Sequence, residues 1–181
     1  AVSDFILPGD VEEKAPIELI RCGECSLVQL RHTVDRNYIY KEREYWYKSA
    51  GNETMVAALQ DVVNEVSLHV DLKPKDIVID VGSNDSTMLR QYPKNIVRIG
   101  VEPSELAKVG RVEGISVIQD YFPTPVLGSL VENSVKVITS VAQFYNTAQL
   151  RPYMAAVSSL LHPEGVFCLQ LAYFPETLIT K

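Results

Sequence analysis

Residues 76–87 form the stretch that most constrains the fold, because an apolar strand there runs directly into a tight polar turn. The strand part holds four apolar residues that favour β structure, Ile77, Val78, Ile79 and Val81. A run this rich in apolar residues is typical of a strand buried on both faces of a parallel sheet. Gly82 then supplies the break at which the chain turns into a helix. We therefore expect the first strand and cofactor loop of a nucleotide-binding type of α/β domain here.

A second apolar run, 96–101, ends on Glu102, twenty residues after Gly82. This spacing puts a carboxylate at the tip of the neighbouring strand, where it can hold a ribose diol. We therefore expect Glu102, with Pro103 beside it, to bind the ribose of a cofactor.

The turn itself separates two classes of cofactor that use this geometry. A dinucleotide requires G-x-G-x-x-G, because the second glycine admits the pyrophosphate and the third lets the helix pack closely. Here Asn84 and Thr87 stand at these two positions. Asp80 and Asp85 would also repel a pyrophosphate, whereas they suit a cofactor with a sulfonium and an amino group. S-adenosylmethionine (SAM) is therefore expected rather than NAD.

The residues of this stretch that we expect to contact SAM are Asp80, Gly82, Ser83 and Asn84. The alternative is a buried strand followed by a capped helix that binds no ligand, because short motifs also occur by chance.

An alternation of helices and strands continues along the chain. Helices are expected at 52–70, 104–109 and 147–161, and further strands at 115–118, 135–140 and 166–171. This order predicts a Rossmann-like α/β fold with a parallel sheet of about five strands.

Polar residues also follow the third and fourth expected strands. Asp120 and Tyr121 come after 115–118, and Asp120 can accept a hydrogen bond from an adenine amino group or cap a turn. Ser140 ends the next strand, and the exit of that strand is the segment 141–145. This exit would face the cofactor from the other side of the point where the strand order reverses, and Ser140 and Val141 are the residues that we expect to contact it.

Residues 1–50 are expected to form a small irregular module ahead of the α/β domain, 51–181. Cys22 and Cys25 form a C-x-x-C pair with a glycine between them, which is typical of a knuckle that binds zinc. A structural zinc site needs four ligands, and only two are evident. His32 is a candidate third ligand or a surface residue, and Cys168 is expected in a core strand. Zinc is therefore possible, but its site is incomplete.

An aromatic cluster closes this module, namely Tyr38, Tyr40, Tyr45, Trp46 and Tyr47. It can face a substrate with its hydroxyl groups, or it can pack as a plain interface between the module and the main domain. We take Tyr47 as the candidate catalytic residue.

Composition excludes several classes of protein. The net charge of −6 and the lack of a run of Lys and Arg argue against nucleic acid as a partner. No apolar stretch reaches the length of a membrane span, and the first residues do not resemble a signal peptide. Three cysteines fit reduced thiols better than a disulfide framework. A cytoplasmic protein is therefore expected.

Several motifs together resemble one enzyme family. They are Leu7–Asp10, Cys22–Leu30, His32–Val34, Tyr45–Ser49, Asp80–Thr87, Gly100–Ser104, Val137–Ser140 and Gly165–Phe167. In these motifs the chain resembles the SAM-dependent C-methyltransferases of nucleotide-linked deoxysugars, a family with an N-terminal zinc module of cysteines. The resemblance implies a SAM-methyltransferase domain that transfers a methyl group to a sugar carbon next to a ketone. A nucleotide sugar is the small-molecule partner that it implies.

The chain departs from this family in its length, in the loop after Gly82 and at 49–52, where the family has Ser-Gly-x-Asn. Family members are longer, with another C-x-x-C upstream and a His-Glu-His type of motif and a second α/β half downstream, so the chain is expected to be truncated at both ends. Ser86 also stands where the family usually has glycine. If the backbone there needs a positive φ, serine costs about 1 kcal/mol in strain.

A general base is the part of the chemistry that the sequence does not supply. Methylation at carbon requires a base that removes the proton next to the carbonyl group. None of His32, His69 and His162 is expected at a strand end that faces the cofactor. Two classes therefore stay open: a methyltransferase whose catalytic half comes from a partner chain or is missing, and a non-catalytic SAM-fold protein for binding or assembly. An NAD-dependent enzyme is a third and weaker alternative.

We predict that the purified chain carries less than one zinc ion per molecule, because two thiolates leave half of a tetrahedral shell to water. Elemental analysis after dialysis measures this ratio. One firmly held zinc per molecule would mean that His32 or a second chain completes the site.

Overall fold

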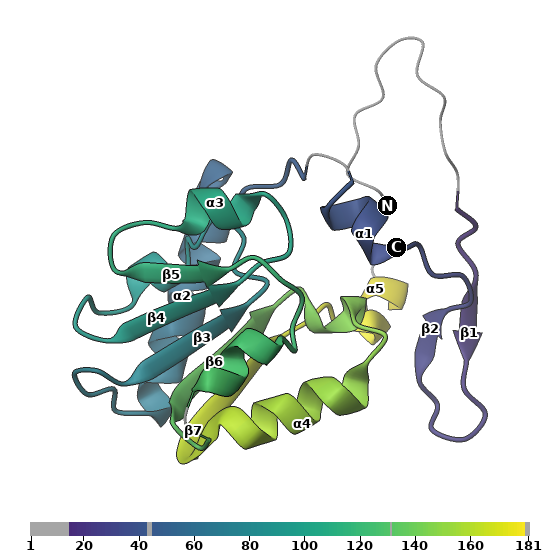
Figure 1. The fold of residues 1–181 in the computed structure, drawn as a ribbon. Helices are drawn as coiled ribbons and strands as arrows, with labels where there is room; N and C mark the ends of the chain where they lie inside the picture. Colours follow the sequence, from purple (N-terminus) through teal and green to yellow (C-terminus); the bar gives the residue numbers. More distant parts are fainter. Residues whose placement is uncertain (1–14, 43–44, 131, 180–181) are drawn as a thin grey trace. The chain divides into compact units, whose positions relative to one another are not determined.

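The computed structural model describes residues 15–42, 45–130 and 132–179, which fall into two compact units, Ala1–Tyr47 and Lys48–Lys181 (Figure 1). The division lies three residues before the boundary expected at residue 50. Lys48 to Ala50 therefore belong to the larger unit.

The first unit contains a short hairpin, in which β1 (Leu19–Arg21) pairs antiparallel with β2 (Val28–Leu30). Cys22 and Cys25 lie in the turn that joins these strands, and Ser26 takes a left-handed conformation with φ 64°. A five-residue helix, α1 (Arg36–Tyr40), follows and was not expected from the sequence.

The second unit is built on a parallel sheet of five strands in the order β5-β4-β3-β6-β7. The strands are β3 (Ile77–Val81), β4 (Val97–Val101), β5 (Ile115–Ile118), β6 (Val135–Val141) and β7 (Leu161–Gln170). The Rossmann-like fold is therefore confirmed. Because β3 lies between β4 and β6, the strand order reverses beside it, which is where open α/β sheets bind ligands.

Helices cover both faces of this sheet (Figure 1). The long helix α2 (Glu53–His69) begins at Asn52, whose side chain accepts hydrogen bonds from the amides of Thr54 and Met55. Its apolar stripe packs on the face that contains Val78, and α4 (Leu150–Leu160) packs on the face that contains Ile79. The central strand β3 therefore buries alternate residues in two separate cores.

The helix expected directly after Gly82 is absent from this part of the described chain, and only a 3₁₀ turn, Leu89–Gln91, follows. Gly82, Asn84 and Ser86 all have positive φ, at 78°, 51° and 63°, which is incompatible with a right-handed helix. The helices α3 (Leu106–Gly110) and α5 (Phe174–Ile179) are likewise short.

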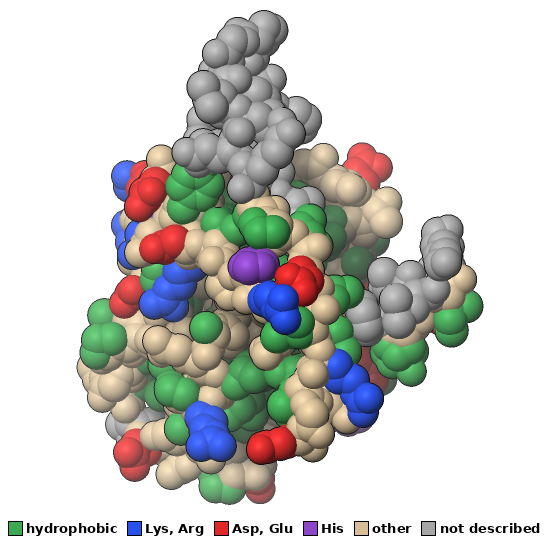
Figure 2. Space-filling model, turned by 90° about the vertical axis from the view of Figure 1, so that its right-hand side faces the viewer, with side chains coloured by type: hydrophobic (Ala, Val, Ile, Leu, Met, Phe, Trp, Pro, Cys, Tyr) green, Lys and Arg blue, Asp and Glu red, His purple; other side chains and the backbone are tan. Residues whose placement is uncertain are grey.

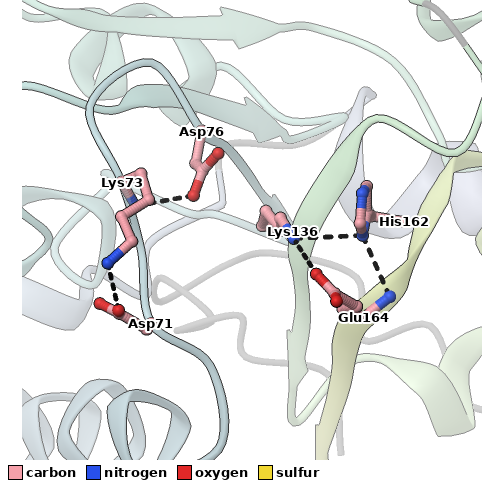
Figure 3. A network of polar contacts seen from close by, with 6 residues as sticks. All are labelled: Asp71, Lys73, Asp76, Lys136, His162 and Glu164. Atoms are coloured by element: carbon pink, nitrogen blue, oxygen red, sulfur yellow. Dashed lines mark hydrogen bonds and ion pairs between the residues drawn. The ribbon is translucent and has the colours of Figure 1, made fainter.

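The strand β7 begins earlier than expected, because residues 161–165 form a bulged start to the strand rather than a turn before it. Val135 pairs with Leu161 and Val137 pairs with Val166, so the residues between them bulge out of the ladder. Lys136 closes the bulge, since its Nζ lies 3.1 Å from His162 Nδ1 and 3.1 Å from Glu164 Oε2 (Figure 3). His162 therefore has a structural role at the amino edge of the sheet.

No helix among the described residues is both long enough and apolar enough to span a membrane. On the face drawn in Figure 2, basic and acidic side chains lie interspersed among apolar ones. The expected lack of a nucleic-acid partner and the expected compartment stay predictions.

Asp80 is an acid inside the sheet rather than in the loop that follows it. Its side chain shares the α2 face with Val78, and Thr139 Oγ1 on β6 donates to its Oδ1 at 2.8 Å. Burial raises the pKa of Asp80 to about 7, against the opposing effect of the Thr139 hydrogen bond and with a contribution from the negative charge of Glu102. Asp80 therefore folds most favourably in its protonated form.

We predict that Asp80→Asn stabilises the protein relative to wild type increasingly as the pH rises from 3.8 to about 7. In this range the unfolded chain ionises Asp80 while the folded chain retains the proton, so wild-type stability falls on the order of a few kcal/mol. Urea unfolding of both proteins across this range measures the difference. The exposed Asp61→Asn serves as control, and a difference for Asp80→Asn that does not change with pH would contradict the assignment.

Candidate functional site

Four segments meet at the carboxyl edge of the sheet, because the parallel strands all end there. They are 82–87 after β3, 102–104 after β4, 119–124 after β5 and 142–146 after β6. With the exception of Tyr47 and the two cysteines of the pair, every site residue expected from the sequence lies in these segments or in the last residues of the strands before them.

The loop after β3 uses its amide groups within the protein. Gly82 N and Ser83 N donate to Val101 O, and Ser86 N donates to Ser83 O. Asn84 N donates to the carboxylate of Glu102 at 3.0 Å. These four N–H groups are therefore not available to form the anion-binding nest that a pyrophosphate requires.

Glu102 ties the loop to the neighbouring strand. Its Oε2 accepts from Asn84 N at 3.0 Å and its Oε1 accepts from Ser104 N at 2.9 Å, and the residue is 4% exposed. Each carboxylate oxygen has a second lone pair, so Glu102 can accept one further donor at each oxygen. Pro103 lies half-buried between these two contacts.

A second set of contacts, which was not predicted from the sequence, holds the loop from the other side. Asn84 Oδ1 accepts from Ser49 N, and Asp85 Oδ2 accepts from Ala50 N, both at 3.0 Å. The other oxygen of Asp85 accepts from the amide and the hydroxyl group of Thr87. The side chains of Asn84 and Asp85 therefore hold the segment just before α2.

Two glycines let the loop pack closely on its neighbours. A Cβ added to Gly100 on β4 would lie 2.4 Å from Ser83 Oγ, and one added to Gly110 on α3 would lie 2.6 Å from Ser86 Oγ. Both hydroxyl groups are buried and have no hydrogen-bond partner among the described residues. Ser83 therefore points beneath the loop, toward β4.

Asp120 caps the turn after β5. Its Oδ1 accepts from Tyr121 N at 2.8 Å and its Oδ2 accepts from Thr124 Oγ1 at 2.7 Å. This geometry agrees with the capping role that was the alternative to adenine binding. Both Asp120 and Tyr121 are half-buried, so the turn remains accessible at the edge.

The exit of β6 brings Gln143 over the glycine turn. Ser140 Oγ lies 3.2 Å from Gln143 Oε1, and Tyr153 Oη on α4 lies 3.4 Å from the same oxygen. A Cβ added to Gly82 would lie 2.8 Å from Gln143 Cγ. The expected residues Ser140 and Val141 therefore lead into Gln143, which lies in the exit expected to face the cofactor but was not among the expected contact residues.

The remaining expected site residues lie in the first unit. Tyr47 is its last residue and is 41% exposed. Cys22 and Cys25 are free thiols, and hydrogen bonds from the backbone of Cys25 and Glu24 lower the pKa of Cys22. His32 Nε2 lies 3.6 Å from Glu18 Oε2. Within the described ranges no group of three or more His, Cys, Asp or Glu side chains could hold a metal ion, so a complete zinc site is not supported.

The histidines of the second unit lie away from the carboxyl edge. His69 ends α2 before β3 and contacts Glu65, and His162 lies in the bulge at the start of β7. The carboxyl edge of this unit therefore presents carboxylate, hydroxyl and carboxamide groups but no imidazole group from these two residues.

No protein-family model matches the chain, but comparison with curated proteins finds a relative. The C-methyltransferase NovU of Streptomyces niveus is 24% identical over 167 residues, which is 90% of this chain and 39% of that protein. The chain therefore spans about two fifths of the length of this curated relative.

Solved structures of methyltransferases share the fold. A candidate sarcosine dimethylglycine methyltransferase from Galdieria sulphuraria superposes with a TM-score of 0.54 at 15% identity, over 65% of this chain and 47% of its own. The carbon methyltransferase of CurJ gives 0.53 at 14% identity, over 67% and 37%. A candidate SAM-dependent methyltransferase from Methanococcus maripaludis gives 0.51 at 13% identity, over 71% and 65%. The chain therefore has the Rossmann-like α/β fold found in these methyltransferases.

Proposed function

We propose that the chain is the SAM-binding part of a SAM-dependent methyltransferase that transfers a methyl group to carbon. The observation that supports this best is the loop after β3, whose amides at Gly82, Ser83, Asn84 and Ser86 are all donated within the protein. A dinucleotide needs free amides there for its pyrophosphate, and SAM has no phosphate. The similarity to NovU, a C-methyltransferase, points in the same direction.

The residues at the carboxyl edge fit SAM in their chemistry. Glu102 would hold the ribose with the lone pairs that its two backbone contacts leave free, and Pro103 would border it. Asp120 and Tyr121 lie at the end of β5, on the adenine side of this ribose position. When bound, SAM supplies an electrophilic methyl group on a sulfonium centre, and the acids at this edge favour such a cation.

A cofactor also requires contacts on the side of β6. Gly82 and Asn84 form the turn beneath this position, and Ser140 and Val141 lie at the end of β6. We propose that these residues contact SAM. Ser83 and Asp80 would contribute indirectly: Ser83 packs the loop against β4, and Asp80 is a buried acid held by Thr139 beneath the loop.

The acceptor that we propose is the sugar carbon of a nucleotide sugar, next to a ketone, as the motif resemblance implies. Loss of the proton from that carbon requires a general base. Since His69 and His162 lie elsewhere in the second unit, we assign proton removal to Tyr47 or to a partner chain. One protein of similar fold, from Haloferax volcanii, was solved in complex with a Trm112 methyltransferase activator, so a partner chain has a precedent in this fold.

The second candidate function is a SAM-fold protein that does not catalyse transfer. Two observations favour it: both oxygens of Glu102 already accept backbone amides, and Gln143 lies over Gly82. Calorimetric titration with SAM and S-adenosylhomocysteine, followed by an assay of labelled-methyl transfer to nucleotide sugars, separates the two. Binding with transfer supports the enzyme, and absence of transfer by the chain and its partner, with or without SAM binding, supports the second function.

We predict that Glu102→Ala weakens SAM binding by about 1–3 kcal/mol, the size of a lost hydrogen bond to a charged group. It also lowers the unfolding temperature without abolishing folding, because two buried amides lose their acceptor. Calorimetry and thermal unfolding measure the two effects. Glu105→Ala, which removes an exposed carboxylate bound to Lys108, is the matched control. Equal SAM affinity in wild type and Glu102→Ala would remove Glu102 from the ribose site.

We predict that Ser86→Gly stabilises the folded protein by about 1 kcal/mol, because Ser86 has a φ of 63° and a buried hydroxyl group without a partner. If SAM binding instead adds a similar amount of strain at this residue, removal of the Cβ also raises SAM affinity, by roughly fivefold. Chemical denaturation and calorimetry measure both quantities. Ser116→Gly on β5, an exposed strand position, is the control and is expected to destabilise. A loss of stability in Ser86→Gly would show that the serine is not strained.

A further inference from the structure

The side chain of Gln143 is oriented by two hydroxyl groups that contact the same oxygen. Ser140 Oγ and Tyr153 Oη lie 3.2 Å and 3.4 Å from Gln143 Oε1. Tyr153 is fully buried, so its hydroxyl proton needs an acceptor within the protein, and the carboxamide oxygen provides one. The amide nitrogen is then directed away from these hydroxyl groups. Its two N–H groups have no acceptor among the described residues.

The backbone holds Gln143 in place at the exit of β6. Ala142 has a φ of 52°, a left-handed conformation that costs free energy for a residue with a Cβ. The amide of Ala142 donates to Gln170 O on β7 at 2.9 Å, which fixes the strained turn. Such strain is characteristic of positions whose geometry serves a function.

The Gln143 carboxamide is located by the methylene groups of its side chain, which pack on the Gly82 turn. A Cβ at Gly82 would lie 2.8 Å from Gln143 Cγ and 3.1 Å from its Cβ, so only glycine fits beneath Gln143. Since the strand order is β4-β3-β6, Gln143 and Glu102 lie on opposite sides of the Gly82 turn. A carboxylate, from Glu102, and a carboxamide, from Gln143, therefore flank this turn.

Because of the strand order, Glu102 and Gln143 would contact different ends of one ligand. With a ribose at Glu102 on the β4 side and adenine toward β5, the amino-acid end of the ligand extends toward β6. That end carries a carboxylate, which requires hydrogen-bond donors. Resting on the proposed function, we propose that the Gln143 carboxamide binds the carboxylate of the amino-acid end of SAM. Ser140 and Tyr153 are then positioning residues that hold the amide nitrogen toward it.

Two ligands and two variants test this inference. S-adenosylhomocysteine carries the amino-acid end, and methylthioadenosine lacks it but keeps adenosine and sulfur. Gln143→Glu keeps the length of the side chain and replaces the N–H donors by a carboxylate, whereas Gln143→Ala removes the group. We expect both variants to bind S-adenosylhomocysteine at least about tenfold more weakly than wild type, with Gln143→Glu the weaker. Affinity for methylthioadenosine should change less than about threefold.

Calorimetry of the full chain with each ligand gives the result, and thermal unfolding checks that the variants fold. Gln149→Ala, which removes an exposed glutamine side chain at the start of α4, is the matched control and should leave both affinities unchanged. Equal weakening for both ligands would assign Gln143 to packing on Gly82 and overturn the inference, as would unchanged affinity for S-adenosylhomocysteine. Failure of the wild-type chain to bind S-adenosylhomocysteine would instead overturn the proposed function.

Discussion

The carboxylate of Glu102 is the contact on which the rest of the carboxyl edge depends. It accepts the amide of Asn84 from the loop after β3 and the amide of Ser104 from the segment after β4. A buried carboxylate that accepts two amides is stabilised by charge-assisted hydrogen bonds, and each amide would otherwise be unsatisfied. One side chain therefore fixes the relative position of the two segments that would hold a nucleoside.

The loop that Glu102 holds is costly to form. Non-glycine residues in the left-handed region are disfavoured, and Asn84 and Ser86 both adopt it. The buried hydroxyl groups of Ser83 and Ser86 add a desolvation cost, since neither has a partner among the described residues. The amides of Ser49 and Ala50 offset part of this cost, because they bind the side chains of Asn84 and Asp85. The conformation of the loop therefore depends on the segment before α2 as well as on β3.

The sequence predicted those features that depend on local pattern. Apolar runs located all five strands of the sheet, and Asn52 located the start of α2, because burial and capping leave a periodic or positional signal. The prediction of a helix after Gly82 was wrong. Asn84 and Ser86 have positive φ there and contact Glu102 and α3, which lie farther along the sequence. Gln143 lay in the strand exit expected to face the cofactor, but its packing on Gly82 joins segments distant in sequence and was not predicted.

The charges at this edge differ in their accessibility, and this difference bears on what the edge can bind. Asp80 is buried on the α2 face and has a raised pKa, so near neutral pH it contributes only part of a negative charge. Glu102 contacts two amides at the end of β4, and each of its oxygens keeps a lone pair that a ligand donor would use. Gln143 on the opposite side carries donors without charge. The edge thus changes from a carboxylate at β4 to a carboxamide at β6, and a ligand that bridges it needs hydroxyl donors at one end and oxygen acceptors at the other. A nucleoside joined to an amino acid has both.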